Sequence, residues 1–205
     1  EPLFRSLIDN WIPALEGVNE KLSRGAKVAD IGCGHGSSTI MMAKQYPNST
    51  FHGHDFHAPS IDEANQKVKD MGLTNISFHE SAATEIPDQG YDFACIFDAL
   101  HDMGDPVGAA KRIRQVLSKD GTFMLVEPMS EDSLQDNLEK NPMAAAYYSF
   151  STLVCVPTSK SQEVGLQLGA QAGQAKLTQV LNEAGFSHVR RASENPSNMV
   201  LEVKA

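Results

Sequence analysis

The fold of this chain is decided by the stretch Val28-Ala29-Asp30-Ile31-Gly32-Cys33-Gly34-His35-Gly36-Ser37-Ser38-Thr39. An apolar strand brings the acid Asp30 toward its end, and glycines follow at positions 32, 34 and 36 before a helix begins. Glycine has no Cβ to keep a ligand away from the backbone, and it tolerates the φ angles of a tight turn between a strand and a helix. Dinucleotide-binding turns have the spacing Gly-x-Gly-x-x-Gly, which would require glycine where this chain has Ser37. The stretch therefore predicts a nucleotide-binding turn of a different spacing, Asp-x-Gly-x-Gly-x-Gly.

Strand and helix patterns alternate along the chain. Strands are expected over 27–31, 50–54, 75–79, 92–97, 121–127, 188–192 and 198–203. Helices are expected over 3–23 (within an N-terminal segment 1–24), 38–45, 60–72, 106–117 and 174–184, the third starting at the capping box Ser60-Ile61-Asp62-Glu63 and the fourth capped by Asp105. The alternation predicts a single α/β domain over 1–205, with a doubly wound, mostly parallel seven-stranded sheet and an antiparallel C-terminal strand.

Length and composition limit the kinds of partner. With 205 residues, of which 41% are hydrophobic, one domain can bury a full core. The net charge of -9 and the scattered Lys and Arg residues argue against binding of nucleic acid. No apolar run has the length of a membrane span, and Cys33, Cys95 and Cys155 lack paired spacing, which is typical of the reducing cytoplasm. The chain starts at Glu1 without Met, so we expect it to be a fragment of a longer protein.

Polar and small residues follow the predicted strands at their carboxyl ends, where ligands bind in sheets of this kind. The second strand is followed by Asp55 and Phe56, and Asp55 lies 23 residues after Gly32, a separation that suits an acid bound to a ribose diol. The third strand is followed by Ser81-Ala82-Ala83, the fourth ends in Phe97-Asp98 and continues to Leu100-His101-Asp102, and the fifth ends at Glu127.

This series of strand ends, over about residues 25–128, resembles the class I S-adenosylmethionine-dependent methyltransferases. The resemblance implies a Rossmann-like fold, an enzyme, and S-adenosylmethionine as cofactor. The backbone around Gly32–Gly34 would face the methionine part, Asp55 would hold the ribose hydroxyls, and Phe56 would lie against adenine. The cofactor-binding set implied is Asp30, Gly32, Cys33, Gly34, Asp55, Phe56, Ser81, Ala82, Phe97 and Asp98. Where the family often has an Asp for the adenine amino group, this chain has Ala82, so the backbone or Ser81 takes that role or adenine is held less specifically.

The segment Leu100-His101-Asp102 resembles the His-Asp segment of small-molecule O-methyltransferases, which implies that His101 is the general base. Methyl transfer to a hydroxyl needs positioning and removal of a proton, and an imidazole with an unperturbed pKa of about 6.5 is mostly neutral at working pH. Glu127 occupies a place similar to that of the family's partner acid, and Asp102 is the second candidate for that role. As an alternative, His101 is a pocket wall or caps the following helix.

A second pattern, His52-Gly53-His54-Asp55-Phe56-His57, is similar to the metal site His-x-His-x-Asp-His of the metallo-β-lactamase fold. His52 and His54 share one face of a strand, which suits chelation. The Asp is fifth in that motif and fourth here, and a metal site would leave the glycine turn unexplained. We therefore expect no metal.

An insertion over 130–170 is too long to be an unstructured connection. Its centre, 143–156, is apolar and helix-capable and follows Asn141-Pro142. As a lid over the acceptor, Met143, Tyr147, Tyr148 and Phe150 would fit a flat apolar substrate. The alternatives are an ordinary core helix, or a docking surface for an absent N-terminal domain or a second copy in a homodimer.

Two functions from different classes follow. The first is a methyltransferase acting on a small, aromatic or quinone-like acceptor. The second rests on a resemblance to the C-terminal part of bacterial proteins that carry a winged-helix domain ahead of a methyltransferase domain. It is a cofactor- or ligand-sensing domain of a transcriptional regulator, with little or no catalysis. The missing acid at Ala82 favours the second reading, and the pair of His101 and Glu127 favours the enzyme.

Overall fold

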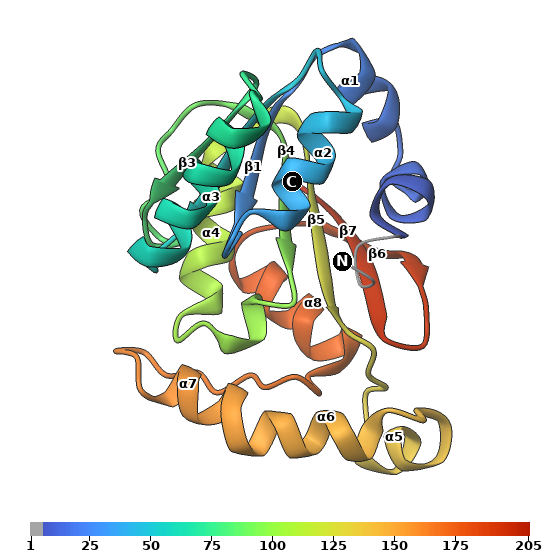
Figure 1. Cartoon of the computed structure of the whole chain (residues 1–205). Helices are drawn as coiled ribbons and strands as arrows, with labels where there is room; N and C mark the ends of the chain where they lie inside the picture. Colours follow the sequence, from blue (N-terminus) through green and yellow to red (C-terminus); the bar gives the residue numbers. More distant parts are fainter. Residues whose placement is uncertain (1–5) are drawn as a thin grey trace.

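A computed structural model describes residues 6–205, and it contains a seven-stranded sheet of order β3-β2-β1-β4-β5-β7-β6 (Figure 1). The strands are β1 Lys27–Ile31, β2 Thr50–Asp55, β3 Ile76–Glu80, β4 Tyr91–Phe97, β5 Leu117–Pro128, β6 His188–Glu194 and β7 Asn198–Lys204. The first five strands pair in parallel, and β7 runs antiparallel to both its neighbours, β5 and β6. The predicted Rossmann-like, doubly wound, mostly parallel sheet with an antiparallel C-terminal strand is confirmed.

Helices cover both faces of the sheet and form two hydrophobic cores. They are α1 Val18–Arg24, α2 Ser37–Gln45, α3 Ala58–Met71, α4 Pro106–Val116, α5 Leu134–Lys140, α6 Ala144–Phe150, α7 Val156–Lys160 and α8 Gly173–Glu183. One core joins α1, α2 and α3 to the sheet and includes Trp11 and Phe51. The other joins α4 and α8 to the opposite face and includes Ile113 and Leu177. The predicted cap of α4 is confirmed, since the Asp105 carboxylate accepts a hydrogen bond from the Gly108 amide at 2.7 Å.

The expected helix over 3–23 is wrong in one respect, because the chain breaks in its middle. Its residues 3–5 lie outside the described part of the chain. A π-helical turn over Leu7–Trp11 and a 3₁₀ turn over Ile12–Ala14 precede α1. Leu15 is extended and Gly17 has a φ of 71°, so the backbone changes direction before Val18. The apolar spacing looked helical because both pieces bury their apolar side chains in the same core.

The expected start of α3 at the capping box is also wrong. The helix begins at Ala58, and Pro59 lies in its first turn, where a missing amide hydrogen costs nothing. Ser60 lies inside the helix, and its hydroxyl is 2.8 Å from Nδ1 of His57, the residue that precedes the helix. Asp55 fixes the entry instead, because its Oδ1 accepts a hydrogen bond from the His57 amide at 2.9 Å.

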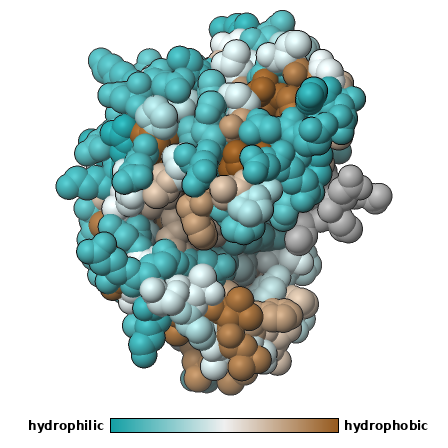
Figure 2. All heavy atoms as spheres, turned by 60° about the vertical axis from the view of Figure 1, so that its left-hand side comes forward, coloured by the Kyte–Doolittle hydropathy of each residue, from teal (hydrophilic) through white to brown (hydrophobic). Residues whose placement is uncertain are grey.

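The insertion after β5 is helical, as expected, and lies along one end of the sheet (Figure 1). It runs through α5 and α6, a π-helical turn over Ser151–Cys155, and α7. Several of its apolar side chains, including Phe150, Leu153 and Val154, are exposed. Figure 2 shows apolar side chains gathered at this lower end of the molecule. None of the described helices combines the length and apolarity needed to cross a membrane.

Candidate active site

A cavity of about 700 Å³ lies at the carboxyl ends of the parallel strands. The strand order reverses there, because the chain continues from β1 to β2 on one side and from β4 to β5 on the other. The lining comes from five parts of the chain: Gly32; His54, Asp55 and Phe56; residues 81–84; Ala99, Asp102, Met103, Asp105 and Ala109; and Thr158, Ser161, Gln162, Glu163 and Val164 of the insertion. The cavity is therefore enclosed between the glycine turn and the end of the insertion.

Two positions of the glycine turn favour glycine through both their backbone conformation and their packing. Gly32 has a φ of 70°, and a Cβ there would lie 3.1 Å from the Cβ of Ala99. Gly36 has a φ of 75°, and a Cβ there would lie 2.3 Å from the ring of Phe78. The left-handed conformation is costly for residues with a side chain. The sequence pattern thus reflects both the tight turn and the close packing beneath it.

Asp30 holds this turn against α2 from below. It is fully buried, and its Oδ2 accepts hydrogen bonds from the hydroxyls of Ser38 at 2.6 Å and Thr39 at 2.7 Å. Burial raises the pKa of Asp30 to about 6, although these hydrogen bonds oppose the shift. Asp30 does not border the cavity, so its contribution to binding is to fix the shape of the turn.

Asp55 and Phe56 border the cavity at the end of β2. The Asp55 carboxylate accepts hydrogen bonds from the amides of Gly34 and His57, both at 2.9 Å. Phe56 is 76% exposed, which leaves its ring free to contact a ligand. Ser81 and Ala82 lie opposite, but the Ser81 hydroxyl is already within 2.9 Å of Nδ1 of His54.

The histidines of the second pattern make hydrogen bonds to hydroxyl groups. Nε2 of His54 lies 3.2 Å from the Tyr91 hydroxyl, and Nδ1 of His52 lies 3.2 Å from the Ser77 hydroxyl. Burial lowers the pKa of His54 to about 4, with smaller contributions from His79 and His52. In the described part of the chain these rings do not bring three ligand atoms together.

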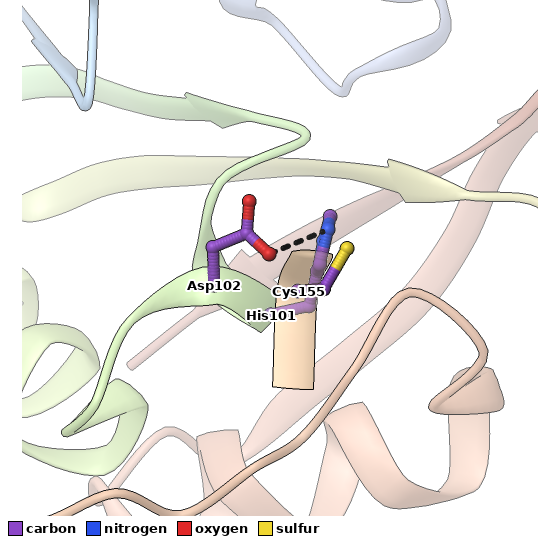
Figure 3. Close-up of side chains that lie close together, drawn as sticks. All are labelled: His101, Asp102 and Cys155. Atoms are coloured by element: carbon purple, nitrogen blue, oxygen red, sulfur yellow. Dashed lines mark ion pairs between the residues drawn. The ribbon is translucent and has the colours of Figure 1, made fainter. Parts of the chain in front are cut away.

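His101 is buried in the 3₁₀ turn Leu100–Asp102 that follows β4. Its Nδ1 is hydrogen-bonded to Oε2 of Glu127, and Oε1 of Glu127 accepts a hydrogen bond from the Leu100 amide at 3.0 Å. Its Nε2 faces Oδ1 of Asp102 at 3.3 Å, and the Cys155 thiol lies beside both (Figure 3). His101 therefore contacts both of the other predicted catalytic residues.

The charges around His101 contradict the expectation of a neutral ring. Burial lowers the pKa of His101, but the charge and hydrogen bond of Glu127 and the charges of Asp102 and Asp98 outweigh it and raise the pKa to about 9. In this arrangement the ring is an imidazolium. Burial, followed by the charge of Glu127, raises the pKa of Asp98 to about 7, although Asn198 donates a hydrogen bond to Asp98 at 2.7 Å.

The structure divides the predicted site residues into two groups. Those that border the cavity are Gly32, Asp55, Phe56, Ser81, Ala82 and Asp102; those that do not are Asp30, Cys33, Gly34, Phe97, Asp98, His101 and Glu127. Within the second group, His101 is 4% exposed and lies behind its neighbour Asp102, which borders the cavity.

One alternative for the insertion is a lid formed by four of its side chains. Met143, Tyr147, Tyr148 and Phe150 do not border the cavity. The Tyr147 hydroxyl donates a hydrogen bond to the Ser197 carbonyl at 3.0 Å, and Phe150 is exposed. The insertion lines the cavity with α7 and the loop after it. There Gln162, which sequence reasoning missed, accepts a hydrogen bond from the Gly104 amide at 2.7 Å and donates one to the Asp102 carbonyl at 2.9 Å. In the sequence, the one feature that could have pointed to Gln162 is the change from apolar to polar residues after Val156.

Comparison with known proteins gives the same family as these features. A family model described as a methyltransferase domain matches residues 22–185. An uncharacterized protein of Rickettsia prowazekii is 39% identical over 77 residues, which are 38% of this chain and 14% of that protein. A demethylmenaquinone methyltransferase of Listeria monocytogenes is 27% identical over 184 residues, or 85% of this chain and 76% of that enzyme. The crystal structure of magnesium protoporphyrin IX methyltransferase from Synechocystis, with bound SAM, shares the fold with a TM-score of 0.63 at 17% identity, covering 100% of this chain and 79% of that one.

Proposed function

Because the chain belongs to the methyltransferase domain family, we propose that it transfers the methyl group of S-adenosylmethionine to a small, aromatic or quinone-like acceptor. One observation carries the proposal: a single cavity has the glycine turn and Asp55 on one side and Asp102, the neighbour of His101, on another. A methyl donor and its acceptor can therefore meet beside a group able to move a proton.

The cavity fits the cofactor. A Cβ on Gly32 would fill the space next to Ala99, so glycine keeps the floor of the cavity open. Asp55 places a carboxylate at its edge, suited to accept hydrogen bonds from two ribose hydroxyls, and the exposed ring of Phe56 supplies an apolar surface for adenine. The bound sulfonium supplies an activated methyl group. The bound SAM of the Synechocystis enzyme, which has this fold, supports the assignment.

His101 accepts the acceptor's proton in this proposal. Glu127 fixes the ring through Nδ1 and leaves Nε2 to face the reaction. Nε2 meets the Asp102 carboxylate in the ligand-free arrangement, and Asp102 is partly exposed to the cavity, so an acceptor hydroxyl can take its place. Because the ring is charged in this arrangement, it must first release its Nε2 proton to water in the cavity.

The cavity lining indicates an apolar acceptor. Ala83, Ala99, Met103 and Val164 contribute apolar surface near Asp102. A flat ring with one hydroxyl can pack on such surface while its polar group reaches the polar cluster. The demethylmenaquinone methyltransferase relative supports a quinone-like molecule.

Binding and turnover are measured separately. Calorimetry should detect S-adenosylmethionine and its demethylated product, and not NAD; preferential binding of NAD would overturn the assignment. A screen of phenols and quinols, with the demethylated cofactor product as readout, should then identify an acceptor.

The exposed apolar face at Phe150, Leu153 and Val154 favours a second candidate, the sensing domain of a larger regulator. There the face would contact another domain or a second copy, and cofactor binding would alter that contact. Cofactor binding without turnover on any phenol or quinol favours this candidate, whereas turnover favours the enzyme.

A further inference from the structure

Three side chains with metal-binding atoms meet beside the cavity. Nε2 of His101, a carboxylate oxygen of Asp102 and Sγ of Cys155 all lie within 4.8 Å of one another (Figure 3). His101 and Asp102 belong to the turn after β4, whereas Cys155 ends the π-helical turn of the insertion. Turns of π-helix inside α-helices occur frequently at functional sites. Sequence analysis gave no indication of this cluster, because only the fold brings Cys155 to the end of β4.

The spacing suits a tetrahedral ion. Zinc bonds of about 2.0–2.1 Å to nitrogen and oxygen and about 2.3 Å to sulfur place neighbouring ligand atoms about 3.3–3.6 Å apart. Nε2 of His101 and Oδ1 of Asp102 already stand at 3.3 Å. Sγ of Cys155 lies at most 4.8 Å from the other two ligand atoms, so it would have to move by no more than about 1.3 Å to reach the spacing of a zinc site.

The surroundings of the ring are those of a metal ligand. Glu127 is bonded to Nδ1, which leaves Nε2 directed at the cluster, and a carboxylate behind a histidine in this way orients metal-binding histidines generally. Oδ1 of Asp102 is buried, and apart from its ion pair with Nε2 of His101 at 3.3 Å it accepts no hydrogen bond from any described residue. This oxygen therefore faces the cluster and can accept a further ligand.

The local charge attracts a cation. The carboxylates of Glu127, Asp102 and Asp98 all act on the His101 ring. In the described part of the chain, no Lys or Arg forms an ion pair with any of these three carboxylates. Asp102 borders the cavity, which gives an ion from solvent a path to the cluster.

We propose that His101, Asp102 and Cys155 bind one divalent transition-metal ion of the zinc class, with Glu127 as a positioning residue. Nitrogen, sulfur and oxygen donors together suit zinc, and three protein ligands leave its fourth position open to water. Binding releases the thiol proton of Cys155 and the proton on Nε2 of His101. Nε2 of His101 cannot bind the ion and accept the acceptor's proton at the same time, so zinc inhibits methyl transfer. The site goes beyond the proposed function, and its binding test requires no turnover.

Cobalt(II) is the probe for binding. The chain is treated with a chelator, dialysed and titrated with cobalt(II) chloride. We expect one ion per chain, with an absorption band from thiolate to cobalt and the visible bands of a tetrahedral ion, both lost when zinc chloride is added. Cys155→Ser should remove the thiolate band, and Asp102→Asn should weaken binding by at least 10-fold. Glu127→Gln should weaken it by about 10- to 100-fold while keeping the thiolate band, as expected of a group behind a ligand.

The matched control is Cys95→Ala, because Cys95 is a buried cysteine in β4 outside the cluster. It should retain the thiolate band, and thermal unfolding of the ion-free variants checks that each is folded. An octahedral spectrum without a thiolate band, or a band that survives Cys155→Ser, would overturn the site. In a turnover assay, zinc should inhibit the unmodified chain at concentrations at least 10-fold lower than those needed for Cys155→Ser. If zinc binds and turnover rises instead, the metal site stands and the assignment of His101 as proton acceptor fails.

Discussion

Glu127 holds His101 at two points. One carboxylate oxygen is bonded to Nδ1 of the His101 ring, and the other accepts a hydrogen bond from the amide of Leu100, the preceding residue, at 3.0 Å. The end of β5 thereby fixes both the ring and the turn that carries it. Two strands that are separate in sequence share this contact, so the direction of Nε2 depends on the sheet and not on a flexible loop.

His101→Ala should lower turnover by about 10²- to 10⁴-fold, the usual contribution of a positioned general base. The cofactor's affinity should stay nearly constant, because His101 does not border the cavity. The assay is run with a chelator present so that metal does not affect the comparison. A His101→Ala variant as active as the parent would show that His101 takes no part in proton removal, with catalysis resting on proximity.

Glu127→Gln should lower kcat less than His101→Ala, while KM for the acceptor stays unchanged. Glutamine can still accept from the Leu100 amide, so the turn is retained, but the charge beside the ring is lost. Initial rates over a range of acceptor concentrations separate the two parameters. A rise in KM with constant kcat would instead assign Glu127 to acceptor binding.

Asp55→Ala should weaken binding of S-adenosylmethionine by about 1–3 kcal/mol, the usual loss for hydrogen bonds to a charged group. Calorimetry measures the effect, and Asp62→Ala, an exposed acid on α3, is the matched control that should bind normally. Asp55 also accepts hydrogen bonds from two backbone amides, so the more conservative Asp55→Asn and thermal unfolding of each variant are included. Unchanged affinity in a folded Asp55→Ala protein would remove Asp55 from the site.

Gly36→Ala should destabilise the fold by about 2–4 kcal/mol, from the left-handed backbone and from overpacking against Phe78. Gly90→Ala is the control, because Gly90 has a φ of 64° but a Cβ there would meet nothing within 4 Å. It should lose only about 1–2 kcal/mol. Urea unfolding compares the two, and equal losses would show that contact with Phe78 carries no cost.

Asp30 should make stability depend on pH. Its folded-state pKa of about 6 lies above the ordinary value of 3.8, so its contribution is full below pH 3.8 and is lost as pH rises through about 6. The substitution Asp30→Asn removes this titrating group. The free energy of unfolding of the variant minus that of the parent should therefore increase over this interval, by an amount on the order of 2–3 kcal/mol. Denaturant titrations at several pH values measure the difference, and parallel curves would contradict the raised pKa.

The sequence by itself determined the sheet and the nucleotide-binding turn. Strands buried on both faces are continuous apolar runs, and glycines at 32 and 36 are required by the backbone and by what packs on it, so both leave a local pattern. The positions of Asp55 and His101 at strand ends followed from that alternation alone, because parallel strands bring their carboxyl ends to one edge.

The tertiary structure decided what those side chains do. The ring of His101 is charged because Glu127, Asp102 and Asp98 surround it. Asp98, His101 and Asp102 follow β4, whereas Glu127 lies at the end of β5, and only the sheet brings these two strand ends together. Cys155 and Gln162 reach the site because of the path of the insertion, which apolar composition could not specify. A local pattern records the backbone's own requirements, whereas pKa values and contacts across the fold depend on distances that no stretch of sequence contains.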